Sequence, residues 1–256
     1  MISTTSIPPK PEKLSNRDTK EPSTMGKVNE KDKTGRTVTL TNVRTSFADS
    51  LHTASLPKKN NDPNAKPKHG ANFILESDTP DFDSNKAACI SAMKAASREF
   101  KKPEDWWKTL WEDKPDNLSF KKGDRFKSDA GEIYKGYKGN IVVSAKGPQG
   151  GLKRPQMRDR NKRIIEVSEI LDVVYNGTYA DVIISFYGTE NGGTPRITCS
   201  VESIRSRQVG ERLGGGGIYV DEDDFDTLPQ DNSFDDGPST SGASSKPKSD
   251  DFDLDI

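Results

Sequence analysis

Alternating apolar and polar positions predict five principal strands in the middle of the chain. Residues 36–47 place Val38 and Leu40 on one face, and the apolar parity then shifts to Val43, which indicates a bulge or bend. The Asn-Gly-Gly sequence at 191–193 predicts a hairpin turn. The other four strands are predicted at 71–76, 132–146, 178–187 and 195–207. In the last two strands the inward face is predicted to hold Ala180, Val182, Ile184, Phe186, Ile197, Cys199 and Val201.

A helical block interrupts the strands after the second one. Residues 85–101 carry apolar side chains at helical spacing, from Cys89 to Phe100, and predict an amphipathic helix. A second short helix is predicted after Pro103, and its three tryptophans, at 106, 107 and 111, favour packing against the core. Five strands with inserted helices predict a mainly β protein built as a closed antiparallel barrel. The OB-fold is the usual five-stranded member of that class.

Composition divides the chain into three parts. Only 30% of the residues are hydrophobic and 31% are charged. Residues 1–33 are rich in proline, serine, threonine and lysine, and residues 214–256 are rich in glycine, serine and acidic residues, so both segments are predicted to be disordered. The predicted organisation is a disordered N-terminal arm at 1–33, an OB-fold domain at 34–213 and a disordered acidic C-terminal tail at 214–256.

Charge is distributed unevenly between the predicted domain and the tail. The tail holds 12 acidic residues and 2 lysines, a net charge of −10, which leaves about +9 on residues 1–213. A basic body attracts a polyanion, and an acidic tail can compete for the same surface. No run of about 18 apolar residues exists and the first 20 residues lack an apolar segment, so we expect a soluble, cytoplasmic protein with no membrane partner.

Aromatic residues interleaved with cations are the strongest candidate binding signal. In the run 134–138 flat rings suited to base stacking alternate with lysines suited to phosphate contact. The alternative is that Tyr137 belongs to the core and Tyr134 to the barrel rim. The run 153–163 holds six cations in eleven residues, and its alternative is a solvated charge run. Weaker basic patches lie at 58–68 and 121–127.

The sequence contains few residues and motifs that are typical of enzyme active sites. The chain has two cysteines and two histidines, and it has neither a phosphate-binding P-loop nor a nucleophile elbow. We therefore expect no catalytic residues, no metal site and no cofactor. A metal-dependent nuclease and a strand-annealing protein stay as alternatives.

The chain resembles the bacteriophage single-stranded DNA-binding proteins of the phage Enc34 type, which are relatives of the T7 phage protein. The most specific resembling motif is Arg154-Pro155-Gln156-Met157-Arg158-Asp159-Arg160-Asn161. Further resembling segments are 43–47, 71–75, 134–137, 141–146, 176–180, 184–187 and 210–215.

The resemblance implies an OB-fold that binds single-stranded DNA without sequence preference in phage replication, recombination and repair. The expected location is the host cytoplasm, because the sequence shows neither a signal peptide nor a transmembrane segment. The residues expected to contact DNA are Phe47, Tyr134, Lys135, Tyr137, Lys138, Arg154, Arg158, Arg160, Lys162, Arg163, Tyr179 and Tyr187. The resemblance also implies a tail that contacts replication proteins, such as the polymerase and the helicase-primase, and a homo-oligomer on DNA is a further expectation. The expected partner-binding residues are Asp250, Asp251, Phe252, Asp253, Leu254, Asp255 and Ile256.

Overall fold

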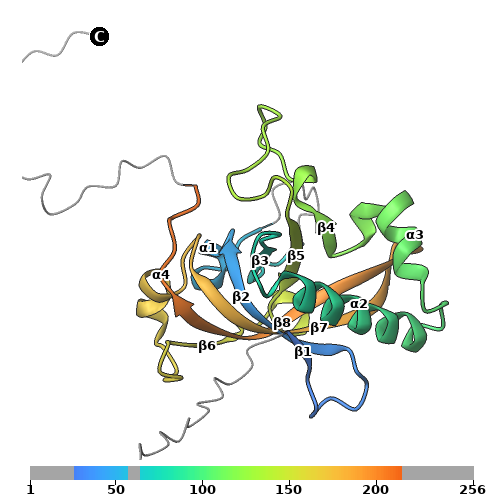
Figure 1. Cartoon of the computed structure of the whole chain (residues 1–256), viewed down its shortest axis with the longest axis horizontal. Helices are drawn as coiled ribbons and strands as arrows, with labels where there is room; N and C mark the ends of the chain where they lie inside the picture. Colours follow the sequence, from blue (N-terminus) through green and yellow to red (C-terminus); the bar gives the residue numbers. More distant parts are fainter. Residues whose placement is uncertain (1–25, 57–63, 215–256) are drawn as a thin grey trace, which may run out of the picture. The chain divides into compact units, whose positions relative to one another are not determined.

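The computed structural model of the chain describes residues 26–56 and 64–214 (Figure 1). Their strands are β1 (Lys27–Val28), β2 (Thr37–Ser46), β3 (Gly70–Leu75), β4 (Phe120–Lys122), β5 (Ile141–Lys146), β6 (Gln156–Arg158), β7 (Tyr179–Asn191) and β8 (Thr194–Gln208). Their α-helices are α1 (Asp49–His52), α2 (Phe82–Glu99), α3 (Trp106–Asp113) and α4 (Ile170–Val173). Short 3-10 turns are η1 (Pro115–Asn117), η2 (Gly123–Arg125), η3 (Gln149–Gly151) and η4 (Val167–Glu169).

Five of the strands form a closed barrel, which confirms the predicted fold class. β2 pairs antiparallel with β3 on one side and with β7 on the other. β3 continues antiparallel to β5, and β7 continues antiparallel to β8. The barrel closes where Lys146 of β5 pairs in parallel with Ser200 of β8. This order, with one parallel contact at the closure, is the strand arrangement of an OB-fold.

The inward faces are those that the alternation predicts. Residues of β7 and β8 from Ala180 to Val201 on the predicted face are at most 1% exposed. The register of β2 against β7 shifts between Leu40 and Val43, so the predicted bulge is confirmed. Asn42 lies in this bulge at a φ of 53°, and its backbone N–H donates to Asp181 Oδ1 at 3.0 Å.

Helix α2 packs against β7 and β2 (Figure 1), and its buried residues belong to the same core as the inward faces of these strands. It begins three residues before the predicted start, and Cys89, Met93 and Ala96 are fully buried as the helical spacing predicts. Asn85 anchors it, because its side chain accepts from Thr41 N–H at 2.9 Å and donates to Thr41 C=O at 2.8 Å. The three tryptophans of α3 pack against the core, as predicted.

Two predicted segments differ in the structure, and β4, β6, α1 and α4 are elements that the sequence analysis did not predict. Residues 27–28, which the composition assigns to a disordered arm, pair with β2 as β1. The predicted strand at 132–146 begins only at Ile141, because Gly136 and Gly139 take φ values of 81° and 74° that turn the chain out of a strand. The rest of the predicted arm, at 1–25, and the predicted tail from 215 lie outside the described residues. Among the described residues, no helix is long and apolar enough to cross a membrane.

Candidate nucleic-acid interface

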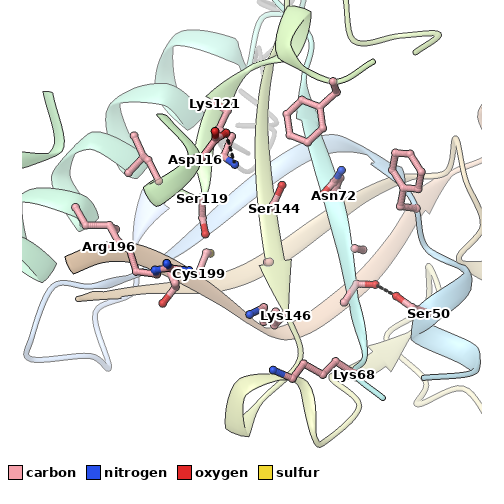
Figure 2. A pocket seen from close by; sticks show the side chains of 18 of the residues that line it. Ser50, Lys68, Asn72, Asp116, Ser119, Lys121, Ser144, Lys146, Arg196 and Cys199 are labelled. Atoms are coloured by element: carbon pink, nitrogen blue, oxygen red, sulfur yellow. Dashed lines mark hydrogen bonds and ion pairs between the residues drawn. The ribbon is translucent and has the colours of Figure 1, made fainter. Parts of the chain in front are cut away.

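A groove of about 680 Å³ runs over the outer face of β3, β4, β5 and the start of β8 (Figure 2). The strands present short polar side chains to it, because successive residues of a strand point to opposite faces. Asn72 comes from β3, Ser144 from β5 and Thr198 from β8. Their small size leaves the floor of the groove open to a ligand.

Four cations surround this groove, and Figure 2 shows them on separate elements. They are Lys68, Lys121, Lys146 and Arg196. The acidic residue that lines the same groove is Asp116, whose carboxylate is 3.9 Å from Lys121 Nζ and 3.4 Å from Arg125. The groove therefore carries an excess of positive charge.

The cations of the groove are poorly compensated. Desolvation, with the charges of Lys68 and Arg196, lowers the pKa of Lys146. Desolvation and the charges of Arg125 and Arg196 likewise lower the pKa of Lys121, against the opposing effect of Asp116. The Nε atom of Arg196 is buried without a hydrogen-bond partner among the described residues. Like charges held together in this way favour the binding of an anion.

Phe47 stands at one end of the groove in an unusual conformation. Its side chain is 44% exposed, and its φ of 50° lies in the left-handed region that residues with a Cβ seldom adopt. The following N–H, of Ala48, donates to Asn176 Oδ1 at 2.6 Å and holds the turn. The rings of Phe47 and Tyr134 meet edge to face at 5.1 Å between centroids. An exposed ring held in a strained turn is typical of a functional position.

The loop at 132–140 explains where the predicted tyrosines lie. Tyr137 is fully buried, and it packs with Ile74 and Val142 in a small second core on the outer face of the sheet. Its hydroxyl accepts from Asn72 Nδ2 at 3.0 Å, and burial raises its pKa. The structure thus places the predicted stacking residue Tyr137 in the core, which is the alternative that the sequence left open. Tyr134 is half-buried above it.

The two remaining predicted tyrosines lie on the outer face of β7. Tyr179 donates to Glu76 at 2.9 Å, and Arg44 lies over its ring at 5.5 Å from the centroid. Tyr187 is half-buried further along the strand. Neither residue lines the groove.

Three of the four arginines of the basic run at 153–163 are engaged within the protein. Arg154 donates to the carbonyl oxygens of Leu51 at 2.7 Å and His52 at 2.6 Å. Arg158 donates to the carbonyl oxygen of Lys162 at 2.7 Å. Arg163 pairs with Asp159 and Glu169, and its hydrogen bonds, with that of the Glu166 N–H, lower the pKa of Glu169 to about 2.

No residue of the run lines the groove. Arg160 and Lys162 are exposed. Arg158 and Lys162 line a separate pocket of about 400 Å³ that they share with Asp181 and Arg205. Lys135 and Lys138 are exposed on the loop at 132–140. Of the residues predicted to contact DNA, the groove therefore contains Phe47 alone.

None of the four groove cations is among the residues that the sequence analysis expects to contact DNA. The outward parity of Lys146 and Arg196 on their strands was the available signal, and Lys68 and Lys121 belong to the two weaker basic patches. The described part of the chain contains no group of three or more His, Cys, Asp or Glu side chains that could hold a metal ion. Both cysteines are buried, and desolvation raises the pKa of each thiol.

A closed five-stranded barrel is the architecture of OB-fold proteins, a class that binds oligonucleotides and oligosaccharides, and an excess of cations in a groove favours anionic ligands. The family model described as the single-stranded DNA-binding protein of Enterobacter phage Enc34 matches residues 36–236. The chain belongs to this family. No curated protein matches the sequence.

Solved structures of the bacteriophage Enc34 single-stranded DNA-binding protein share the fold. One, in complex with single-stranded DNA, has a TM-score of 0.57 at 18% identity and covers 76% of this chain and 96% of its own. Another has a TM-score of 0.56 at 20% identity and covers 80% of this chain and 95% of its own. A single-stranded DNA-binding protein of bacteriophage T7 is more distant, with a TM-score of 0.41 at 11% identity over 73% of this chain and 98% of its own.

Proposed function

We propose that this protein coats single-stranded DNA without reading its sequence, and that the groove over β3, β4, β5 and β8 is the main binding surface. The observation that carries the proposal is the set of four cations around a groove with one lining carboxylate and an exposed, strained Phe47 at its end. Membership of a phage single-stranded DNA-binding family supports it.

The chemistry of the groove explains the expected selectivity. Lysine and arginine side chains neutralise phosphates and release counterions, so affinity falls as salt rises. Every base has a π face, and a ring such as that of Phe47 can stack on any of them, which gives little sequence preference. In a duplex the bases are stacked inside, so the aromatic contribution is lost and binding is weaker.

A fluorescence anisotropy titration of the full chain tests the proposal. We expect oligo-dT to bind more tightly than a duplex of equal length, with a log-log salt slope of roughly −0.7 for each phosphate contacted. Labelled oligo-dT incubated with the protein and Mg²⁺ should stay intact, because the proposal includes no cleavage. The proposal is wrong if the titration detects no binding of oligo-dT in a buffer of low salt concentration.

We also propose that the acidic tail at 214–256 regulates binding. Its net charge of −10 makes it a competitor for the same cations that hold phosphates. A chain truncated after residue 213 should bind oligo-dT more tightly than the full chain, most visibly at low salt. Equal affinities of the two chains at low salt would contradict this role.

The family supports a role in phage replication, recombination and repair in the host cytoplasm. In that role the segment 250–256, which alternates acidic and apolar residues, is proposed to contact replication proteins such as the polymerase and the helicase-primase. Co-sedimentation of the full chain with each of those phage proteins should be abolished when residues 250–256 are removed. If the shortened chain still co-sediments with these proteins, residues 250–256 do not form the interface.

A further inference from the structure

A second pocket, of about 480 Å³, lies behind Phe47 and is called the rear pocket. Its apolar lining includes the side chains of Phe47, Tyr134, Leu171 and Tyr175. Phe47 also lines the groove, so the two spaces meet at this residue. The volume falls within the roughly 300–1,000 Å³ that is usual for small-molecule sites in proteins.

Part of the wall of the rear pocket comes from the segment that follows β8, residues 209–214, which we call the strap. Leu213 is 5% exposed, and its N–H donates to the carbonyl oxygen of Asn176 at 2.8 Å. The Tyr175 hydroxyl donates to the Gly210 carbonyl oxygen at 2.9 Å. A Cβ at Gly177 would clash with the Glu211 carbonyl oxygen, so glycine is needed where the strap crosses. These contacts build the pocket before any ligand arrives.

Two cations and one carboxylate line the rear pocket, and the carboxylate, that of Asp49, accepts from Asn176 Nδ2 at 3.0 Å. Lys135 comes from the loop at 132–140, and Arg212 comes from the strap. The guanidinium of Arg212 lies 4.2 Å from the centroid of the Tyr175 ring, which fixes its position. Flat rings inside a pocket with cations at its edge match a nucleotide, because the base is flat and apolar on its faces and the phosphate is anionic.

An acidic side chain of the strap, that of Glu211, forms an ion pair with one of these cations, Lys135. The Glu211 carboxylate is 2.5 Å from Lys135 Nζ and 3.9 Å from Arg44. Lys135 lowers the pKa of Glu211, so the carboxylate is charged. The Lys135 and Glu211 side chains are 61% and 68% exposed, so the pair can separate without exposing buried surface.

We propose that the rear pocket accepts one nucleobase of the bound strand, that Lys135 and Arg212 hold its phosphate, and that Glu211 stands in for this phosphate in the free protein. The inference rests on the proposed function and extends the path of the strand from the groove, over Phe47, into the rear pocket. Binding then exchanges the ion pair of Lys135 with Glu211 for one with DNA.

The substitution Glu211→Gln tests this exchange because it should raise the affinity for DNA, whereas a misfolded variant would lose affinity. It should tighten oligo-dT binding about two- to fivefold at low salt, the range expected for one exposed ion pair. The double variant K135A/R212A should weaken binding and reduce the salt slope by roughly 0.7 for each phosphate that is no longer neutralised. Matched controls are Glu30→Gln and Lys33→Ala, exposed residues of the turn between β1 and β2, which should bind like the unmodified chain.

Photo-crosslinking locates the base directly. An oligonucleotide containing 5-iodouracil should crosslink to Tyr134 or Tyr175, and mass spectrometry of the digested protein identifies the modified residue. The inference is overturned if crosslinks avoid both tyrosines, or if Glu211→Gln and K135A/R212A bind like the unmodified chain. The proposed function survives that result as long as the unmodified chain binds oligo-dT; failure of that binding would end both.

Discussion

The basic run at 153–163 and the groove over β3, β4, β5 and β8 use cations in opposite ways. The run is dense in sequence, but its arginines at 154, 158 and 163 donate to carbonyl oxygens or pair with carboxylates of the same protein. The groove draws its cations from four separate places in the sequence, and Asp116 is the acidic residue among its lining residues. Local density of positive charge therefore does not measure how much of it is available to a ligand.

The difference has a simple physical basis. An arginine that donates to protein oxygens has already exchanged water for those partners, and a phosphate would have to displace them. Desolvation and neighbouring cations lower the pKa values of Lys121 and Lys146, so a bound phosphate relieves repulsion as well as adding attraction. We expect the groove to supply the affinity and the run to supply stability.

Charge reversal in the two regions should have the largest effect and separates them most clearly. K121E/K146E in the groove should weaken oligo-dT binding on the order of 100-fold at low salt and reduce the salt slope by about 1.4, because two phosphates are no longer neutralised. R160E/K162E, at the exposed part of the run, should have a much smaller effect. Anisotropy titrations across a salt series measure both, with K31E/K33E as the control. Equal reductions in affinity for the two regions would mean that the run also binds DNA.

Phe47→Ala should produce the next largest effect. Removal of one stacking ring is expected to cost about 1–3 kcal/mol of binding free energy. Because no charge is removed, the salt slope should stay unchanged while the affinity falls at every salt concentration. The same titrations test this, and circular dichroism serves as the folding control. A changed slope would show that the ring acts by placing a cation rather than by stacking.

Arg154→Ala tests the structural role assigned to the run. It leaves the carbonyl oxygens of Leu51 and His52 without their donor, which should lower the free energy of unfolding by about 1–3 kcal/mol. Urea denaturation measures that change. DNA affinity of the folded variant should change little. A strong decrease in affinity without a decrease in stability would place Arg154 at the DNA instead.

The smallest expected effect is on pH dependence. Because the pKa values of Lys121 and Lys146 are lowered, rising pH removes their charge before that of ordinary lysines, and affinity should fall earlier in the alkaline range. Below that range both lysines are charged and affinity should be constant. K121R/K146R should bind with a flatter profile, because arginine keeps its charge. Titrations between about pH 7 and about pH 10 compare the two proteins, and identical profiles would exclude the lysines as the cause.

Much of the barrel could be predicted because side-chain alternation is a local property of a strand. The buried faces of β7 and β8, the bulge in β2 and the stripe of α2 all follow from residues close together in the sequence. The strand prediction from this alternation was wrong at 132–140. Gly136 and Gly139 have left-handed backbone conformations there, so the segment forms a loop that places Tyr137 in a second core.

Local patterns along the chain were enough to place most of the strands, their inward faces and the surplus of positive charge before residue 214. Which cations remain available to a ligand depends instead on how the chain folds. Arg154 finds its acceptors about a hundred positions earlier in the chain, and the groove exists because β5 pairs with β3, β4 and β8 at one register. Pairing between distant segments decides which side chains come into contact, and the alternation of residues within one segment cannot predict those contacts.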